Sequence, residues 1–276
     1  MPLTLVPTPI GNLEDITLRA LRVLKNADVI ACEDTRTSSV LLRHYGISAP
    51  LVPFHLHNEN QMTPRLLSEL REGKNVAVIS DAGTPGISDP GWILLKRAID
   101  EGIDADVLPG PTAVLPAVLL SGLSPQPFLF YGFPPEKPGE RAKLFEFIKP
   151  LPYTVCFYIS PHKAGRHIAE MAAAFGDRNA ALVREISKIH QEAIRGRLSE
   201  IVERLGEGLK GEMALVMEGY GAESERGEAE DAWKAEADVM LSEGKTARDI
   251  ARELASRFNV SKNAVKEYVM RGGEIL

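Results

Sequence analysis

The sequence predicts an α/β protein with two α/β domains and a small, helix-turn-helix-like module at its C-terminal end. Three observations support this fold class. First, short apolar segments with strand character alternate with segments whose apolar residues recur at helical spacing, a pattern typical of a mainly parallel, doubly wound sheet. Second, the stretch from Ser124 to Gly139 contains five prolines and interrupts this alternation. Third, an acidic, polar segment precedes two further amphipathic helices.

The first domain is predicted to span residues 1–122, because the proline-rich stretch marks a boundary near Gly122. Its apolar segments suit buried strands, and the amphipathic segments between them suit helices. We expect strands at residues 3–10, 28–34, 75–80 and 105–110, and helices at 16–27, 38–47, 64–74, 91–103 and 112–123.

The second domain is predicted to span residues 123–222, with mixed-sheet or hairpin character near its end because little chain separates the later strands. The two cysteines, Cys32 and Cys156, lie in apolar strand-like segments. We therefore expect buried thiols in a reducing cytoplasm rather than redox or metal sites. The strands are expected at residues 128–133, 154–160, 180–186, 190–196 and 212–219.

The C-terminal region is predicted to consist of a flexible acidic linker, residues 223–231, and a helical module, residues 232–276. Thr246 and Ser261 are placed to cap its two helices. Basic residues lie on the polar faces of both helices. Two interpretations stay open: a hairpin that docks on the body, or a module that contacts nucleic acid.

Composition and charge indicate a globular protein and argue against a membrane-spanning or secreted one. The chain has 276 residues, 44% of them hydrophobic and 25% charged, as in ordinary globular proteins. Its net charge is −6, but six acidic residues fall between 218 and 231, so the body is nearly neutral and an anionic partner stays open. No apolar run approaches the ~20 residues that span a bilayer, and the first residues show no secretory signal. We expect a cytoplasmic protein with no membrane partner.

A glycine- and proline-rich loop, Ser80–Gly91, follows one predicted strand. It lacks the lysine of a phosphate-binding P-loop and the glycine spacing of a dinucleotide site. It carries Asp81 and Asp89 and no cation, which favours a positively charged ligand with hydroxyls and a ring over an anion. A simple strand-to-helix turn is the alternative. Three other unusual segments, residues 6–17, 32–39 and 108–113, follow strands at the same predicted edge, where open α/β sheets bind ligands.

Motifs spread along the chain carry a resemblance to a known family. They include "VPTPIGNLEDITLRAL", "ACEDTR", "ISDAGTPGISDPG", "PGPTA", "FYGFPP", "YISPHK", "REISKIHQE" and "GEMALVMEG". With these motifs the chain resembles the tetrapyrrole (corrin/porphyrin) methylase superfamily, and within it the branch that methylates ribosomal RNA. "YISPHK" and "ISKIH" depart slightly from that branch, which typically has E-S-P-H-R and Leu-Thr-Lys there, but keep basic or hydroxyl chemistry.

The resemblance implies two α/β domains with an S-adenosylmethionine cleft between them, a homodimer, and no metal. It implies 2′-O-ribose methylation of a cytidine in the decoding region of small-subunit (16S) ribosomal RNA. Two alternatives remain. One is a small-molecule (tetrapyrrole-like) or protein methyltransferase of the same fold. The other is a helix-turn-helix regulator whose α/β body senses a ligand. In that case the motif residues expected between the two domains would have no catalytic role.

By the same resemblance, cofactor-binding residues are expected in the strand-end loops and across the cleft. A composite catalytic site is expected from Asp34 and Arg36 of one domain and Glu185 and Lys188 of the other. Because a ribose hydroxyl is a poor acid, a general base is needed, and Asp34, His57, Glu59, Glu185 and a deprotonated Lys188 are its candidates. Scattered basic residues such as Arg36 and Lys188 could pair with RNA phosphates. The expected cofactor contacts are Pro9, Gly83, Thr84, Ile87, Thr112, Ala113, Ile159 and Ala214, with Arg184 or Glu185 beside them.

Overall fold

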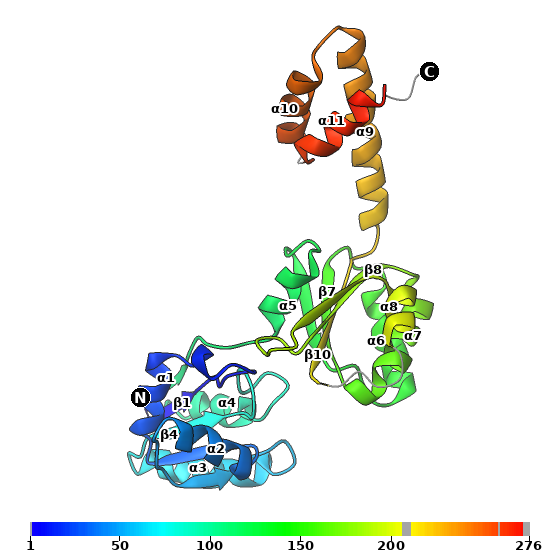
Figure 1. Cartoon of the computed structure of the whole chain (residues 1–276). Coiled ribbons are helices and arrows are strands. Elements are labelled where there is room, and N and C mark those ends of the chain that lie inside the picture. The colour runs from blue at the N-terminus through cyan, green and yellow to red at the C-terminus, as the bar shows by residue number, and fades with distance from the viewer. Residues whose placement is uncertain (1, 206–210, 259, 273–276) are drawn as a thin grey trace. The chain divides into compact units, whose positions relative to one another are not determined.

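The computed structural model describes residues 2–205, 211–258 and 260–272, and Figure 1 shows its elements. The chain forms two compact units. The larger unit comprises residues 1–149 and 153–218, and the smaller comprises residues 150–152 and 219–276. Both β-sheets belong to the larger unit.

A parallel sheet with the strand order β3-β2-β4-β1-β5 forms the first lobe of the larger unit. Every neighbouring pair in it is parallel, so all five strands end at one edge. The short strand β3 was missed, because it ends in Pro53 and proline argues against a strand. The strands are β1 (Leu3–Leu5), β2 (Val29–Cys32), β3 (Leu51–Pro53), β4 (Val76–Ile79) and β5 (Ala105–Val107).

Helices cover both faces of this sheet, as the alternating pattern predicts. On one face, α1 (Leu18–Lys25) and α2 (Thr35–His44) share a core with the side chains of Ile30 and Cys32. On the other face, α3 (Glu59–Arg71) and α4 (Trp92–Asp100) pack against Leu3. Successive strand residues point to opposite faces, so β2 and β4 contribute to both cores.

A mixed sheet with the order β6-β7-β10-β8-β9 forms the second lobe. Strands β6 and β7 are parallel, whereas the β7–β10, β10–β8 and β8–β9 pairs are antiparallel. The predicted mixed or hairpin character is therefore confirmed. The strands are β6 (Phe128–Gly132), β7 (Thr154–Ile159), β8 (Asn179–Arg184), β9 (Glu192–Arg197) and β10 (Met213–Met217).

Helix α5 (Val114–Ser121) corrects the predicted boundary near Gly122. Its buried residues Val114, Ala117 and Val118 share one core with Cys156 and Val216 of the second sheet. The chain therefore leaves the first lobe before α5 begins. The proline-rich stretch indicated a later boundary because it follows α5, whereas the chain enters the second lobe before α5.

The remaining helices of the second lobe are α6 (Pro138–Ile148), the short 3₁₀ turn η2 (Pro161–Lys163), α7 (Ala164–Phe175) and α8 (Leu198–Leu205). Helix α7 contacts both α6 and α8. Both cysteines are buried free thiols, as expected. Burial raises the pKa of Cys156 to about 12.

The smaller unit contains three helices within its described residues: α9 (Ala222–Ser242), α10 (Ala247–Arg257) and α11 (Lys262–Met270). They share a core that includes Trp233 and Leu254. The Thr246 side chain accepts a hydrogen bond from Asp249 N–H, and Ser261 accepts one from Ala264 N–H, so both predicted caps are confirmed. Residues 223–231, expected as a flexible linker, belong instead to helix α9.

Candidate functional site

Three strand-end loops of the first lobe are tied together by hydrogen bonds. Thr8, after β1, exchanges two backbone hydrogen bonds of 2.9 Å with Gly83, after β4. The Thr8 hydroxyl also donates to the carbonyl of Ser80 at 3.0 Å. The Thr84 hydroxyl donates at 3.1 Å to the carbonyl of Pro111, in the loop after β5. These bonds make the carboxyl edge of the sheet one connected surface.

Two glycines permit this close approach. Gly83 has φ +84°, a conformation that L side chains adopt at a cost. A Cβ atom added to Gly110 would lie 2.8 Å from the Cβ of Pro7 in the first loop. Glycine is therefore required at position 83 by the backbone conformation of the turn, and at position 110 by the close contact with the first loop.

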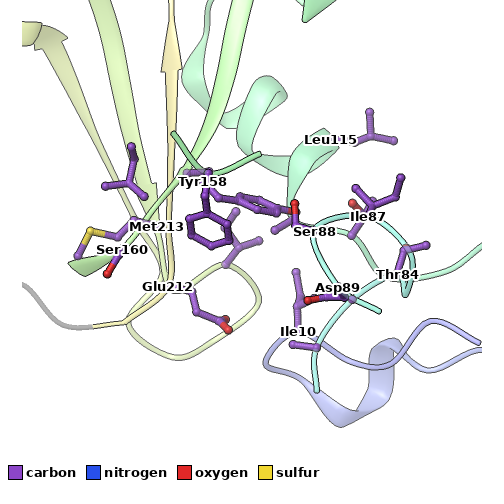
Figure 2. A pocket seen from close by; sticks show the side chains of 18 of the residues that line it. Ile10, Thr84, Ile87, Ser88, Asp89, Leu115, Tyr158, Ser160, Glu212 and Met213 are labelled. Atoms are coloured by element: carbon purple, nitrogen blue, oxygen red, sulfur yellow. The ribbon is translucent and has the colours of Figure 1, made fainter. Parts of the chain in front are cut away.

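A cavity of about 510 Å³ opens at this edge, and both lobes line it (Figure 2). Its volume falls in the range of small-ligand sites. Figure 2 shows Ile10, Thr84 and Asp89 of the first lobe with Tyr158 and Glu212 of the second. The lining residues are Ile10, Ala82, Gly83, Thr84, Ile87, Ser88, Asp89, Thr112, Ala113, Leu115, Phe133, Tyr158, Ile159, Ser160, Pro161, Ile186, Glu212, Met213 and Ala214.

The second lobe reaches the cavity because strand β10 runs antiparallel to β7. Met213, at the start of β10, pairs with Ile159, at the end of β7, and Ala214 pairs with Tyr158. The end of one strand and the beginning of its neighbour therefore lie at the same edge. Glu212 immediately precedes β10 and joins the lining for the same reason.

The structure places seven of the eight expected cofactor contacts on the cavity wall. Pro9 is the exception: its neighbour Ile10 lines the cavity and Pro9 does not. Neither Arg184 nor Glu185 is in the lining. The seven residues are Gly83, Thr84, Ile87, Thr112, Ala113, Ile159 and Ala214.

The charge of the cavity is acidic. Asp89 and Glu212 line it, and no lysine, arginine or histidine is among its lining residues in the described chain. Burial, together with the charges of Glu33 and Asp81, raises the pKa of Asp89 to about 7, while a hydrogen bond from Ser80 acts in the opposite direction. Such a cavity suits a ligand with a positive charge.

The four expected catalytic residues form two separate ion pairs. Arg36 Nη2 lies 2.7 Å from Asp34 Oδ2, and Lys188 Nζ lies 3.0 Å from Glu185 Oε1. Among the described residues, no hydrogen bond or ion pair joins one pair to the other. Both pairs nevertheless border the cavity: Asp34 N–H donates to Asp81 Oδ1 at 3.2 Å, next to the lining residue Ala82, and Lys188 Nζ lies 3.4 Å from Glu212 Oε2.

These pairings change the proton affinities of their members. The hydrogen bond from the exposed Arg36 side chain lowers the pKa of Asp34 to about 2, and the one from Lys188 lowers the pKa of Glu185. Burial alone would lower the pKa of Lys188, but its contacts with Glu185 and Glu212 raise it above its usual value. The lysine therefore stays protonated near neutral pH, contrary to its expected use as a base.

The segment 185–191 closes against the first lobe. A Cβ atom at Gly11 would lie 2.4 Å from Lys188 Cγ and 3.0 Å from the Ile186 carbonyl oxygen. The Ser187 hydroxyl donates to Asp15. Glu185 and Ser187 have φ values of +51° and +67°, which non-glycine residues rarely adopt. The glycine of the "PIGNLED" motif therefore makes room for a loop of the opposite lobe.

Two other base candidates lie away from the cavity lining. Glu59 is buried at the start of α3, and its Oε1 accepts hydrogen bonds from the backbone N–H groups of Gly91 (2.9 Å) and Ile93 (3.0 Å). It caps α4, which has no side-chain cap of its own. His57 is exposed and does not line the cavity.

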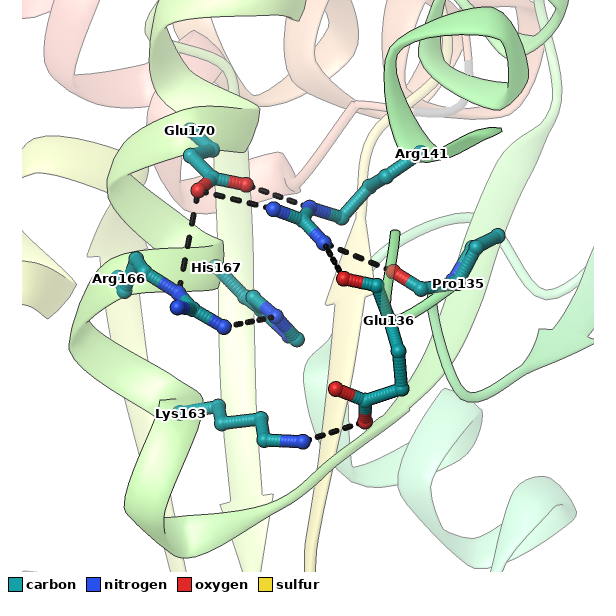
Figure 3. Close-up of polar contacts among 7 residues, drawn as sticks. All are labelled: Pro135, Glu136, Arg141, Lys163, Arg166, His167 and Glu170. Atoms are coloured by element: carbon teal, nitrogen blue, oxygen red, sulfur yellow. Dashed lines mark hydrogen bonds and ion pairs between the residues drawn. The ribbon is translucent and has the colours of Figure 1, made fainter. Parts of the chain in front are cut away.

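A buried arginine, Arg141, is bonded to a carboxylate and to two backbone carbonyls (Figure 3). Arg141 is 3% exposed and forms two hydrogen bonds with the Glu170 carboxylate, at 2.6 and 3.1 Å. It also donates to the carbonyls of Pro135 (2.8 Å) and Glu136 (3.0 Å), which anchors the loop that begins with the lining residue Phe133. Beside it, His167 is also buried, at 1% exposed.

The structure adds lining residues that the sequence did not single out for the site: Ser88, Asp89, Tyr158 and Glu212. Asp89 was visible as one of two charges in the Ser80–Gly91 loop. No sequence signal pointed to Glu212, because its position depends on the antiparallel pairing of β10.

No cluster of potential metal ligands occurs in the described parts of the chain. None of the described helices is long and apolar enough to cross a membrane.

The fold is that of a known family. The sequence model of the tetrapyrrole (corrin/porphyrin) methylases matches residues 2–202, and the chain belongs to this family. The crystal structure of uroporphyrin-III-C-methyltransferase from Thermus thermophilus superimposes with a TM-score of 0.58 at 26% identity. The superposition covers 78% of this chain and 93% of the Thermus chain.

Within the family, the chain is similar to proteins named ribosomal RNA small subunit methyltransferase I. It is 46% identical over 224 residues to the one from Streptococcus pyogenes serotype M1, covering 81% of this chain and 78% of that protein. It is 41% identical over 270 residues to the one from Bacillus subtilis (strain 168), covering 95% and 92%. The second alignment extends over nearly the whole chain and so reaches into the C-terminal helices.

Proposed function

We propose that the protein is an S-adenosylmethionine-dependent methyltransferase that modifies small-subunit ribosomal RNA. The observation that carries this proposal is the 41% identity to the Bacillus subtilis enzyme over 95% of the chain. The cavity supports it independently, because an acidic, partly apolar pocket at the strand ends is compatible with such a cofactor. Because its proposed substrate is ribosomal RNA, we place the protein in the cytoplasm.

The residues of the cavity fit S-adenosylmethionine. This cofactor carries a sulfonium charge and no phosphate, and the described lining residues include two carboxylates and no cationic side chain. Ile10, Ile87 and Leu115 offer apolar surface to its adenosine. The exposed backbone of the Ser80–Gly91 loop and the hydroxyl of Thr112 offer hydrogen-bonding groups. When bound, the cofactor supplies an electrophilic methyl group.

The acceptor in this proposal is the ribose 2′-oxygen of a cytidine in the decoding region of 16S ribosomal RNA. The two lobes hold the reactants together, and alignment of this kind contributes several kcal/mol to catalysis. The Asp34–Arg36 and Glu185–Lys188 pairs lie on opposite lobes, the first bonded to Asp81 beside the lining and the second to the lining residue Glu212. In the proposal, Arg36 and Lys188 contact RNA phosphates, and their acidic partners fix the orientation of the cations.

The smaller unit is proposed to grip ribosomal RNA through phosphates. Several of its basic residues are neutralised by ion pairs, including Arg257 with Glu236 and Arg252 with Asp249. Arg248, Lys262 and Lys266 have no ion pair among the described residues and are available for phosphate contacts. The alternative, a purely stabilising module, is tested by the truncation described in the Discussion.

A homodimer is part of the same proposal. Leu119 of α5 is 69% exposed and lies outside the cavity lining. Exposed apolar groups of this size are typical of interaction surfaces. Sedimentation of the wild type and of Leu119→Asp tests the assignment, which predicts a dimer for the former and a monomer for the latter.

The reaction is tested by transfer of a labelled methyl group to isolated small ribosomal subunits that lack the modification. We expect label in the small-subunit RNA, none in large subunits, and none with Thr84→Arg, whose side chain fills the cavity. Thr84→Arg should also lose the thermal stabilisation that S-adenosylhomocysteine gives the wild type. Methylation of a tetrapyrrole precursor without methylation of RNA would support a reaction like that of the Thermus relative and overturn the proposal.

A further inference from the structure

The proposed reaction needs a group that accepts the proton of the ribose hydroxyl, and the expected candidates do not supply it. Glu59 is occupied as a helix cap, and Lys188 is protonated. Asp34 and Glu185 are ion-paired outside the cavity lining. Two carboxylates do line the cavity: Asp89 of the first lobe and Glu212 of the second.

Asp89 is held firmly in this position. Ser88 before it has φ +65°, a strained conformation for a serine that also lines the cavity. Pro90 after it has a restricted backbone. Gly91 is fixed by its hydrogen bond to the buried Glu59. Figure 2 shows the Asp89 side chain beside Ile10, with Glu212 on the opposite lobe.

The two carboxylates differ in their surroundings. The Glu212 side chain is 69% exposed, and its Oε2 lies 3.4 Å from Lys188 Nζ. Asp89 is half-buried and has no cation bonded to it among the described residues. The groups that act on it are Glu33 after β2, Asp81 after β4 and Glu212 before β10, all acidic, with Ser80 as its hydrogen-bond partner. Tyr158 of β7 faces it as well, and its own pKa is raised to about 12 by burial and by nearby acidic groups that include Asp89.

We propose that Asp89 is the general base of the methyl transfer, an inference that rests on the proposed function. The ribose 2′-oxygen forms a bond to the methyl carbon while the carbon–sulfur bond breaks and its electron pair stays on sulfur. The hydroxyl proton passes to Asp89 Oδ. The proton then leaves to solvent, since Asp89 is only half-buried. The neutral thioether and the methylated ribose are the products.

The elevated proton affinity of Asp89 suits this role. A base with a pKa near the working pH combines a large ionised fraction with a strong tendency to take up a proton. Only the ionised form acts, so kcat/KM should rise about tenfold per pH unit below pH 7 and level off above it. A bound sulfonium favours the ionised carboxylate, so the corresponding rise in kcat should lie at lower pH.

The first test is Asp89→Asn, which keeps the shape of the side chain and removes its basicity. We expect kcat to fall about 100-fold or more, with S-adenosylhomocysteine affinity within about threefold of wild type. The control is Asp100→Asn, an exposed aspartate of α4 paired with Lys96, which should leave kcat unchanged. Reduced S-adenosylmethionine affinity with an unchanged kcat would show that Asp89 only faces the sulfonium, and would overturn the proposal.

The second test is Glu33→Gln, which changes the charge beside Asp89 and leaves Asp89 itself in place. Losing a neighbouring negative charge favours the ionised form of Asp89, so its pKa falls and the rise of kcat/KM moves to lower pH. A purely structural Asp89 would give no such shift. This variant also keeps the proposal testable if Asp89→Asn does not fold.

A third readout does not depend on activity. With carbon-13-labelled aspartate, one carboxyl resonance should titrate near pH 7, disappear in Asp89→Asn and titrate at lower pH in Glu33→Gln. An active wild type with an equally active Asp89→Asn overturns this inference alone. A wild type that methylates no ribosomal RNA overturns the proposed function, and the inference with it.

Discussion

Glu59 offers the sharpest test of how the first lobe is held together. Its carboxylate accepts hydrogen bonds from Gly91 N–H and Ile93 N–H, at 2.9 and 3.0 Å, and the residue is 4% exposed. Glu59→Ala leaves both N–H groups without their protein partner, the one of Gly91 in a buried position and the one of Ile93 in a half-buried position. Losing this partner costs about 1–3 kcal/mol for the buried Gly91 N–H and about 1 kcal/mol for the half-buried Ile93 N–H, and the buried methylene groups add roughly 1 kcal/mol. We therefore expect the free energy of unfolding to fall by about 3–5 kcal/mol.

Glu59→Gln separates the hydrogen bonds from the charge. Its amide oxygen still accepts from the two N–H groups, so the loss should be only about 1–2 kcal/mol. The control is Glu72→Ala, at the exposed end of the same helix, which should cost about 0.5 kcal/mol or less. The Glu59→Ala variant should also bind S-adenosylhomocysteine more weakly, because Gly91 closes the loop that carries Asp89.

Urea unfolding measures these differences. Trp92 follows Gly91 directly, so its fluorescence in a Trp233→Phe background reports on this part of the first lobe. The reasoning is refuted if Glu59→Ala shifts the urea midpoint no further than Glu72→Ala does. A stable Glu59→Ala variant that has lost methyl transfer but still binds S-adenosylhomocysteine would make Glu59 a candidate general base again.

Three further predictions concern the contacts around the cavity and the smaller unit. Gly11→Val should displace the 185–191 loop and lower kcat/KM about tenfold, with stability reduced by about 1–3 kcal/mol; an unchanged melting temperature and rate would contradict the packing described. Arg141→Ala should cost about 3 kcal/mol in thermal unfolding, and Arg141→Lys less, since lysine keeps the charge but not the forked geometry; equal losses would argue against the bidentate contact. Truncation after Gly221 should leave cofactor binding intact and remove the salt-sensitive part of subunit affinity; equal affinities and salt slopes for both forms would leave the module purely structural.

The strand-end loops were predictable because parallel strands end at a common edge. Glycine and proline in "SDAGTPGISDPG" marked the loop, and its lack of a cation indicated a cationic ligand. Seven expected contacts consequently line the cavity. The caps of α10 and α11 were predictable for a related reason: capping depends on residues only three positions apart, and Thr246 and Ser261 lie at those positions.

The missed features depend on long-range contacts. Helix α5 is apolar on most of its surface, so its sequence does not say which sheet it covers. The capping role of Glu59 could not be predicted, because its partners, Gly91 and Ile93, are more than thirty residues away. The segment before Trp233 is acidic and contains glycine, but it continues as helix α9 into the core of the smaller unit, and that packing outweighs weak local propensity.

The most direct test of the account is the chemical identity of the methylated nucleoside. Small-subunit RNA labelled by the enzyme is digested with alkali, which cleaves only where a free 2′-hydroxyl remains. The account predicts that the label is found in an alkali-resistant dinucleotide whose 5′ nucleoside is 2′-O-methylcytidine. Label in an alkali-released mononucleotide would place the methyl group on a base and contradict ribose methylation.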